Sequence, residues 1–269
     1  MKKIFLATTG AICLAFGANA ATVTATDGSQ GWYENDTRPG GTAEIVNVSG
    51  TGGNLEANAP AGTGVVKLTT DATNAAKAEI GISQNFGSVS DVINKDFQLS
   101  YTWYDTAGTS DAAPSVKLEF VNTGYAGDGY GQLIFEPYAQ GANPTSYITP
   151  TKGDWVTTTI DLNQGRAWNT GMFNIGSSFA GPPNNTLDEW LSTFDAGFGE
   201  ASLIGVSVGI GSYNPSEVGY FDNISLSING TTTTWDFETM SAVPLPASLP
   251  LLLAGMAGLG LMGRRRRRT

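Results

Sequence analysis

The chain has 269 residues, with 24 acidic and 14 basic side chains, no histidine and one cysteine, and a formal net charge of −10. The lack of histidine excludes Ser-His-Asp and Cys-His catalysis, histidine-ligated zinc and a histidine pH switch. The acidic balance disfavours a nucleic-acid partner, because it repels a phosphate backbone. Carboxylate, lysine or tyrosine chemistry remains open to an enzyme.

Residues 1–20 have the layout of a secretory signal peptide. Two lysines follow the first methionine, an apolar run extends from Ile4 to Phe16, and Ala18 and Ala20 are the small residues at −3 and −1 of a signal-peptidase site. We therefore expect signal peptidase to cleave after Ala20. Cleavage removes Cys13, so the exported chain would have no disulfide and no thiolate metal site.

Residues 21–240 contain short runs in which apolar and polar side chains alternate, separated by Gly, Pro, Asn and Asp. In "SVKLEFV" (115–121), for example, alternation places Val116 and Phe120 inward and Lys117 and Glu119 outside. The other clear runs are residues 97–105, 154–162, 203–210, 220–228 and 231–238. This pattern predicts an all-β fold, a single antiparallel β-sandwich domain over residues 21–240.

One helix is expected near residues 186–195. Thr186 and Glu189 have the spacing of a capping box, and from Leu187 apolar residues follow at i+3, i+4 and i+7. The apolar stripe includes Trp190, which we expect to be packed under the sandwich and not exposed to a ligand.

Seven motifs of the domain resemble a group of secreted bacterial β-sandwich domains. In chain order they are "NAAKAEI", "SYTWYD", "APSVKLEF", "GQLIFEPY", "DWVTTTIDLNQGRAW", "TLDEWLSTF" and "GYFDNISL". That group is similar to carbohydrate-binding jelly rolls of the galactose-binding type and to laminin-G-like sandwiches. The resemblance implies a jelly-roll fold and supplies no catalytic residues.

Asp222 is the candidate metal ligand. Alternation places it on the inward face with Ile224, Leu226 and Ile228, where a carboxylate needs hydrogen bonds, a cation or a metal. In the jelly-roll binding modules that the domain resembles, a carboxylate near the last strands often binds a structural Ca²⁺. The alternative is that Asp222 caps a turn by accepting hydrogen bonds from backbone amides.

Aromatic side chains beside arginine or carboxylate indicate a possible sugar site, because a sugar stacks its C–H face on an aromatic ring and offers hydroxyls to polar groups. Three segments combine these residue types, "WYENDTRPGG", "LIFEPY" and "NQGRAWNTG". They supply the six candidate ligand-binding residues Trp32, Arg38, Glu136, Tyr138, Arg166 and Trp168. The alternative is that the tryptophans plug the ends of the sandwich and the arginines form ion pairs or cation–π contacts.

The C-terminal segment, residues 241–269, has three parts. An uncharged apolar span covers residues 245–262, just long enough to cross a bilayer as a helix, and five arginines follow at 264–268. An arginine cluster stays in the cytoplasm, so the domain would face outward. The segment begins with a motif of two prolines, which block regular helix, made of Val243, Pro244, Leu245, Pro246 and Ala247.

This order of motif, span and basic tail resembles the PEP-CTERM sorting signal of Gram-negative bacteria, in its VPLPA variant. The resemblance implies an exosortase as a partner, transient anchoring in the inner membrane and delivery to the cell surface, the outer membrane or an extracellular matrix. Without both targeting segments the domain has seven basic and 24 acidic residues, a net charge of −17.

The sequence therefore predicts an exported cell-surface or exopolysaccharide-matrix protein without catalytic activity, which binds carbohydrate or has a structural role in the matrix. A glycan hydrolase or lyase that uses carboxylates is the alternative. Glu136 would be its first candidate acid, but hydrolysis needs a second carboxylate at a defined separation, and the sequence does not select one.

Overall fold

A computed structural model describes residues 18–106, 110–124, 129–175, 178–194 and 197–240. The chain divides into two compact units, Met1–Thr239 and Met240–Thr269, and the strands belong to the first. None of the described helices is long and apolar enough to cross a membrane. The sorting motif at 243–247, the apolar span and the arginine tail all lie outside the described residues.

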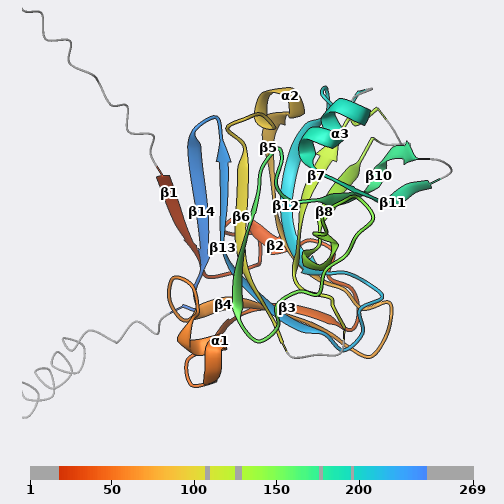
Figure 1. Cartoon of the computed structure of the whole chain (residues 1–269). Coiled ribbons are helices and arrows are strands. Elements are labelled where there is room, and N and C mark those ends of the chain that lie inside the picture. The colour runs from red at the N-terminus through yellow and green to blue at the C-terminus, as the bar shows by residue number, and fades with distance from the viewer. Residues whose placement is uncertain (1–17, 107–109, 125–128, 176–177, 195–196, 241–269) are drawn as a thin grey trace, which may run out of the picture. The chain divides into compact units, whose positions relative to one another are not determined.

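The described strands form two seven-stranded sheets around one apolar core (Figure 1). Sheet A joins β1 (Ala18–Val23), β14 (Thr231–Phe237), β13 (Val218–Ile228), β4 (Gly64–Thr70) and β3 (Gly41–Asn47), with β6 (Gln98–Asp105) and β9 (Trp155–Ile160) also paired through β13. Sheet B has the order β11 (Ser178–Asn185), β10 (Ala167–Ile175), β8 (Gly131–Phe135), β7 (Ser115–Val121), β12 (Ser202–Ile210), β5 (Ala78–Ser88) and β2 (Trp32–Glu34). The predicted all-β sandwich is confirmed.

Sheet B is antiparallel throughout its described pairs, and in sheet A only β1 and β14 run parallel. The predicted signal-peptidase site lies inside β1, where Ala20 pairs with Thr234 and Ala21 with Trp235. Cleavage after Ala20 would leave Ala21, Thr22 and Val23 as a shorter strand at this edge.

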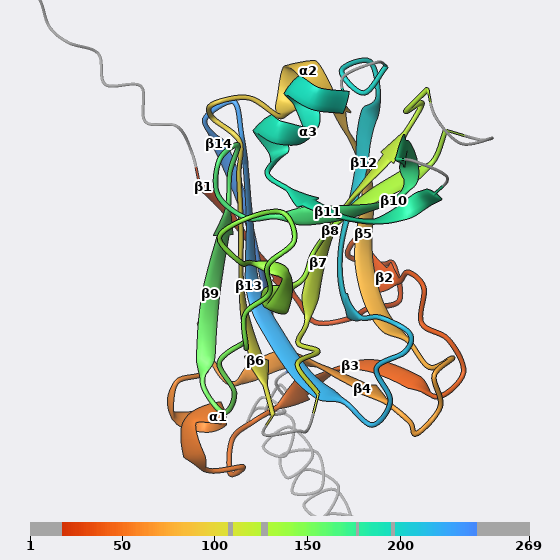
Figure 2. The same ribbon diagram turned by 45° about the vertical axis from the view of Figure 1, so that its right-hand side comes forward.

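Helices are short and lie at the ends of the sandwich. Figure 2 shows α2 (Val89–Val92) and α3 (Leu187–Phe194) at one end and α1 (Gly53–Ala57) at the other, and a 3₁₀ turn covers Pro137–Ala139. The predicted capping box is formed, since Thr186 N–H donates to Glu189 Oε2 at 2.9 Å and Glu189 N–H to Thr186 Oγ1 at 3.2 Å. Trp190 is fully buried, as predicted, and stacks on Phe173 at 4.7 Å.

Alternation along the strands fills the core as the sequence pattern predicts. On β7, Val116, Leu118 and Phe120 are fully buried between the sheets. Lys117 and Glu119 lie on the opposite face of sheet B, yet they are only 3% and 6% exposed. The prediction that these two side chains point away from the core is correct. The implied exposure to solvent is wrong, because polar neighbours on the same face cover them.

Strand β13 changes partners halfway along its length. Val218–Phe221 pairs with β4, whereas Ile224–Ile228 pairs with β14. Asp222 lies at this change, beside Asn223, whose φ of 58° is in the left-handed region that asparagine tolerates. The split therefore puts a carboxylate at a position that pairs with neither β4 nor β14, while on the other edge of β13 Asp222 pairs with Thr102 of β6.

Candidate functional site

Glu136 and Trp168 come together on the face of sheet B that points away from the core. Leu133 and Phe135 of β8 are buried in the core, so Ile134 and Glu136 project from the other face. Trp168 on β10 pairs with Ile134, and its Nε1–H donates to Glu136 Oε2 at 2.8 Å. The bond fixes the orientation of a half-buried indole ring beside a carboxylate.

Both residues line two cavities, which together we call the sheet B groove. The larger, the ion-pair cavity, has about 390 Å³ and is also lined by Asp36, Arg38, Lys77, Ser115, Lys117, Gln132, Ile134, Thr170, Gly211, Ser212, Tyr213 and Asn214. The smaller, the aromatic cavity, has about 150 Å³ and is also lined by Tyr138, Ala139, Tyr147, Gly181, Pro182 and Asn184. Three of the six predicted ligand-binding residues line the first cavity, and a fourth, Tyr138, lines the second.

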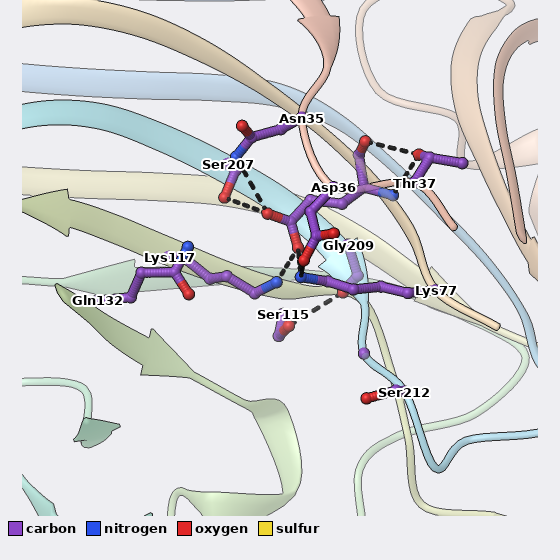
Figure 3. Close-up of polar contacts among 12 residues, drawn as sticks. Asn35, Asp36, Thr37, Lys77, Ser115, Lys117, Gln132, Ser207, Gly209 and Ser212 are labelled. Carbon is purple, nitrogen blue, oxygen red and sulfur yellow. Dashed lines mark hydrogen bonds and ion pairs between the residues drawn. The ribbon is translucent and has the colours of Figure 1, made fainter. Parts of the chain in front are cut away.

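A buried ionic network lies beneath the ion-pair cavity, across the neighbouring strands β5, β12 and β7. Glu79 is fully buried and pairs with the ammonium groups of Lys117 and, at 2.9 Å, Lys77. Its other oxygen accepts from Ser207 Oγ at 2.9 Å, and Ser207 also lies 3.0 Å from Glu119 Oε1. In Figure 3 the side chains of Lys77 and Lys117 extend toward each other below Asp36.

The segment after β2 closes the network from above. Lys77 Nζ contacts Asp36 Oδ2 at 2.6 Å, and Arg38 donates to both oxygens of the same carboxylate at 3.1 and 2.9 Å. Asn35 Nδ2 donates to Glu79 Oε1 at 3.2 Å and to Glu119 Oε1. These bonds explain why charged residues of a solvent-side face are buried.

The charges of this network decide its protonation. Burial by itself would raise the pKa of Glu79, but the ammonium groups of Lys117 and Lys77 outweigh burial and hold that pKa below its ordinary value. Burial lowers the pKa of Lys117 despite Glu79. Partial burial opposes ionisation of Asp36 too, yet hydrogen bonds from Arg38 and Lys77 lower its pKa to about 2. Asp36 and Glu79 therefore stay ionised near neutral pH.

The aromatic cavity has one fixed and one exposed tyrosine. Tyr138 lies in the 3₁₀ turn directly after Glu136, and burial and then the Glu136 carboxylate raise its pKa. Tyr147 stacks on it with ring centroids 5.8 Å apart and an angle of 22° between the planes, and is 57% exposed. Asn184 is 2% exposed, and its Nδ2 has no hydrogen-bond partner among the described residues. A buried amide donor without a partner costs folding free energy, so Asn184 Nδ2 could bind a hydrogen-bond acceptor supplied by a ligand.

Trp32 and Arg166 do not belong to the groove. Trp32 is fully buried and lies edge-on to Trp235 and Phe237 at 5.6 and 5.0 Å, so the prediction of a ligand-stacking surface residue is wrong. The reason is that β2 pairs with β5 and turns this ring inward. Arg166 Nη1 donates to Asn184 O at 3.0 Å and to Glu189 Oε2 at 2.8 Å, which ties the capping box of α3 to β11. Trp32 and Arg166 therefore have the structural roles given as the alternative, a packed tryptophan and an ion-paired arginine.

Asp222 is a buried carboxylate that has no cationic partner in the part of the chain that the structure describes. Its Oδ1 accepts from Phe237 N–H at 2.8 Å, as the turn-capping alternative expects, while Oδ2 is buried and has no partner among the described residues. Burial raises its pKa to about 8, against backbone hydrogen bonds from Phe237 and Asn223 and with the carboxylates of Asp236 and Glu238 adding to the rise.

The donor set fits Ca²⁺ only in part. The orphaned Asp222 Oδ2, together with an orphaned buried Oδ1 on Asp236, is the kind of hard oxygen that Ca²⁺ prefers. However, no three Asp, Glu, Cys or His side chains of the described residues gather closely enough to hold a metal ion. A calcium ion at Asp222 would depend on backbone carbonyls and water for its other ligands, and it stays a prediction.

Several groove residues were not among the predicted ligand-binding set, namely Asp36, Lys77, Lys117, Tyr147, Asn184 and Tyr213. One sequence signal could have found the lysines, because "KAEI" and "KLEF" both contain Lys-x-Glu, which puts a lysine and a glutamate on the same face of two strands. Tyr147 and Tyr213 lie in loops and are 57% and 79% exposed. No periodicity identifies such loop residues.

A further cavity of about 410 Å³ lies elsewhere, between β9 and the loop before it. Trp103, Val156 and Thr158 line it, with ten other residues that include no charged side chain. Trp103 Nε1–H already donates to Thr158 Oγ1 at 2.8 Å. The described lining of this cavity has neither a carboxylate nor an unpaired buried donor, so the sheet B groove is the better candidate site.

No protein-family model matches the chain, and no curated protein matches it. Among solved structures, the family 11 carbohydrate-binding module of Clostridium thermocellum, in complex with a mixed-linked tetrasaccharide, is similar at 16% identity and a TM-score of 0.39, over 76% of this chain and 92% of that chain. A xylan-binding domain from Paenibacillus barcinonensis is similar at 14% identity and a TM-score of 0.34, over 74% and 86%. A cellulose-induced protein is similar at 13% identity and a TM-score of 0.40, over 78% and 93%. All three likenesses are remote, so the chemistry of the groove must come from the chain's own residues.

Proposed function

We propose that this chain is a non-catalytic carbohydrate-binding protein that holds a glycan in the sheet B groove. The observation that carries the proposal is the pair of Trp168 and Glu136, which line both cavities and are joined by a hydrogen bond of 2.8 Å. A sugar ring has an apolar C–H face and an edge of hydroxyls. An aromatic ring next to a carboxylate matches both.

The arrangement of the groove supports a glycan over a small apolar ligand. Beside Trp168 the lining includes Tyr213 in one cavity and Tyr138 and Tyr147 in the other, so aromatic rings recur along the groove. Between them are amides and hydroxyls that can exchange hydrogen bonds with sugar hydroxyls. The indole is held in place by Glu136 before any ligand arrives, which reduces the entropy lost on binding.

The pKa values exclude two carboxylates of the ionic network as the acid of a glycosidase. A glycosidase needs one carboxylic acid that keeps its proton near neutral pH and a second, ionised carboxylate. Asp36 has a pKa of about 2, and the pKa of Glu79 is lowered, so neither can be the acid. A carboxylate-based hydrolase or lyase is the alternative function, and Glu136 would have to be its acid.

The place of action is proposed from the sequence alone. The signal peptide and the VPLPA-type tail support export, sorting by an exosortase after transient anchoring in the inner membrane, and a final location at the cell surface or in an exopolysaccharide matrix. Mass spectrometry of the protein from the native organism tests this part. Retention of both terminal segments in the secreted form would contradict it.

Binding of the full chain to a glycan array and then to the best glycan in solution tests the main proposal. We expect Trp168→Ala to weaken binding at least about tenfold, which is about 1.4 kcal/mol. Trp155→Ala is the matched control, since Trp155 is a half-buried tryptophan of sheet A that contacts Tyr104 at 5.4 Å. Equal losses for both variants, or no glycan bound by the wild type, would contradict carbohydrate binding in the groove. Release of reducing ends from a bound glycan would establish the hydrolase instead.

A further inference from the structure

We propose that the aromatic cavity selects a sugar unit that bears a protonated amine, so that the groove prefers glycans containing an unacetylated amino sugar. This inference rests on the proposed carbohydrate-binding function and adds the chemical class of the ligand. Four features of the cavity carry it: its ring faces, its carboxylate, an unpaired donor and the placement of the cationic residues.

The rings and the carboxylate together form a site for an ammonium group. Tyr138, Tyr147 and Trp168 line a cavity of about 150 Å³ that also contains the Glu136 carboxylate, and no lysine or arginine is part of its described lining. An ammonium ion is attracted to the face of an aromatic ring and forms charge-assisted hydrogen bonds with a carboxylate. A neutral hydroxyl gains much less from both.

Glu136 retains capacity to accept from a ligand. A carboxylate offers about four acceptor positions. Trp168 Nε1–H uses one of them, and it is the one side-chain hydrogen bond that the described residues place on this carboxylate. Acceptor positions on Glu136 are thus available to an ammonium group, which has three donors when it is protonated.

Asn184 indicates that the ligand is more than a bare amine. Its Nδ2 is buried in the wall of the same cavity and has no acceptor among the described residues. A sugar carries hydroxyl oxygens next to its amine and can supply that acceptor, whereas a simple polyamine has none. Glu136 and Asn184 together would therefore recognise a sugar unit that has both an amine and a hydroxyl.

Among the described residues, the positive side chains that line the groove all belong to the ion-pair cavity. Lys77, Lys117 and Arg38 line the ion-pair cavity, so Asp36 and Glu79 already have cationic partners and offer little attraction to an added amine. Their positive charges are directed to Asp36 and Glu79, so that cavity offers a balanced, hydrogen-bonding surface for neutral sugar units. The charge distribution assigns the amine-bearing unit to the aromatic cavity.

Isothermal titration of the full chain with short oligosaccharides of glucosamine, and with N-acetylglucosamine oligosaccharides of the same length, tests the inference. Acetylation removes the charge and keeps the hydroxyls, so we expect the free-amine ligand to bind at least about tenfold more tightly, in line with a charge-assisted contact beside aromatic faces. Glu136→Gln keeps the shape and an acceptor for Trp168, and it should abolish the difference between the two ligands. Tyr147→Leu, at an exposed ring, should reduce it. Glu34→Gln changes an exposed carboxylate outside the groove and should leave it unchanged.

Each other outcome overturns a defined part of the inference. Equal affinity for the two oligosaccharides, or binding of neutral hexose oligosaccharides alone, would overturn amine selection while carbohydrate binding stands. Equal affinity for spermidine at the same ionic strength would overturn the sugar requirement. If no glycan of any kind binds, the proposed function itself fails.

Discussion

Glu79 and Asp222 are both fully buried carboxylates, one in each sheet, and their pKa values move in opposite directions. Glu79 lies among Lys77, Lys117 and Ser207, and its pKa is lowered although burial opposes ionisation. Asp222 has backbone amides as its hydrogen-bond donors, and burial raises its pKa to about 8. Burial is the same in both places, so the partner decides the charge.

The two carboxylates also differ in what their surroundings can bind. In sheet B the cationic partners keep the carboxylates ionised beneath an open cavity, which gives that face a fixed pattern of donors and acceptors. In sheet A the carboxylate lies where β13 changes its pairing from β4 to β14, and one of its oxygens has no partner among the described residues. The first arrangement suits a ligand, and the second suits a proton or a cation.

Removing Glu79 should have the largest effect. Glu79→Gln leaves the buried ammonium of Lys117 without its carboxylate, so we expect the free energy of unfolding to fall by about 3–5 kcal/mol, as for other broken buried pairs. Urea unfolding near neutral pH measures it. The double variant Glu79→Gln/Lys117→Met removes both charges and should recover most of the loss. A loss under about 1 kcal/mol for the single variant would show that the pair behaves like an exposed one.

Asp222→Asn should change how stability depends on pH. Folded Asp222 holds its proton up to about pH 8, whereas the ordinary pKa of an aspartate is 3.8, so between these values the folded state binds more protons than the unfolded state. Stability is therefore greatest below pH 3.8 for this group and falls as pH rises towards 8, by an amount on the order of a few kcal/mol. The asparagine variant should flatten the curve.

In the Asp222→Asn variant we still expect the free energy of unfolding to depend on pH. Burial raises the pKa of Asp105 to about 7, against the attraction of Lys152 and with Glu217 and Asp111 adding to the rise. The folded protein therefore also loses stability through Asp105 as pH rises over the same range. Asp222→Asn should thus reduce the slope without removing it. An unchanged curve would mean that Asp222 is ionised in the folded protein.

Calcium gives a test of the same carboxylate with a smaller expected effect. A ligand that binds only the folded state at 100 times its dissociation constant stabilises it by about 2.7 kcal/mol. We expect Ca²⁺ to raise the melting temperature, EDTA to lower it, and Asp222→Asn to remove both responses. No Ca²⁺ binding by isothermal titration, with unchanged melting in EDTA, contradicts the calcium prediction.

Arg38→Ala should have the smallest effect on stability. The Arg38–Asp36 pair has side-chain exposures of 47% and 43%, and such pairs contribute about 0–1 kcal/mol. Asp36 keeps Lys77 at 2.6 Å, so the buried part of the network should remain intact. Thermal melting of the variant measures the change. A loss as large as that of Glu79→Gln would remove the distinction between the exposed rim and the buried centre of this network.

The sequence predicted the layers of the fold better than the site. Alternation correctly placed Val116 and Phe120 inward and Lys117 and Glu119 on the opposite face, because a strand turns successive side chains to opposite faces whatever their partners are. It also predicted the capping box at Thr186 from a local spacing. It could not decide the burial of Trp32, since that depends on which strand β2 pairs with.

Local pattern alone predicted strands β6, β7, β9, β12, β13 and β14, the helix α3 and the inward face for Asp222, because these follow from periods of two and 3.6 residues. The tertiary structure decided which of those faces meet. It joined Glu79 to Lys77 and Lys117, set Asn184 beside Tyr147, and left Asp222 Oδ2 unpaired. Such pairings depend on strand order and register across the two sheets, which bring residues far apart in the chain, such as Glu136 and Asn184, into the wall of one cavity. The periodicity of the sequence does not predict such contacts between distant residues.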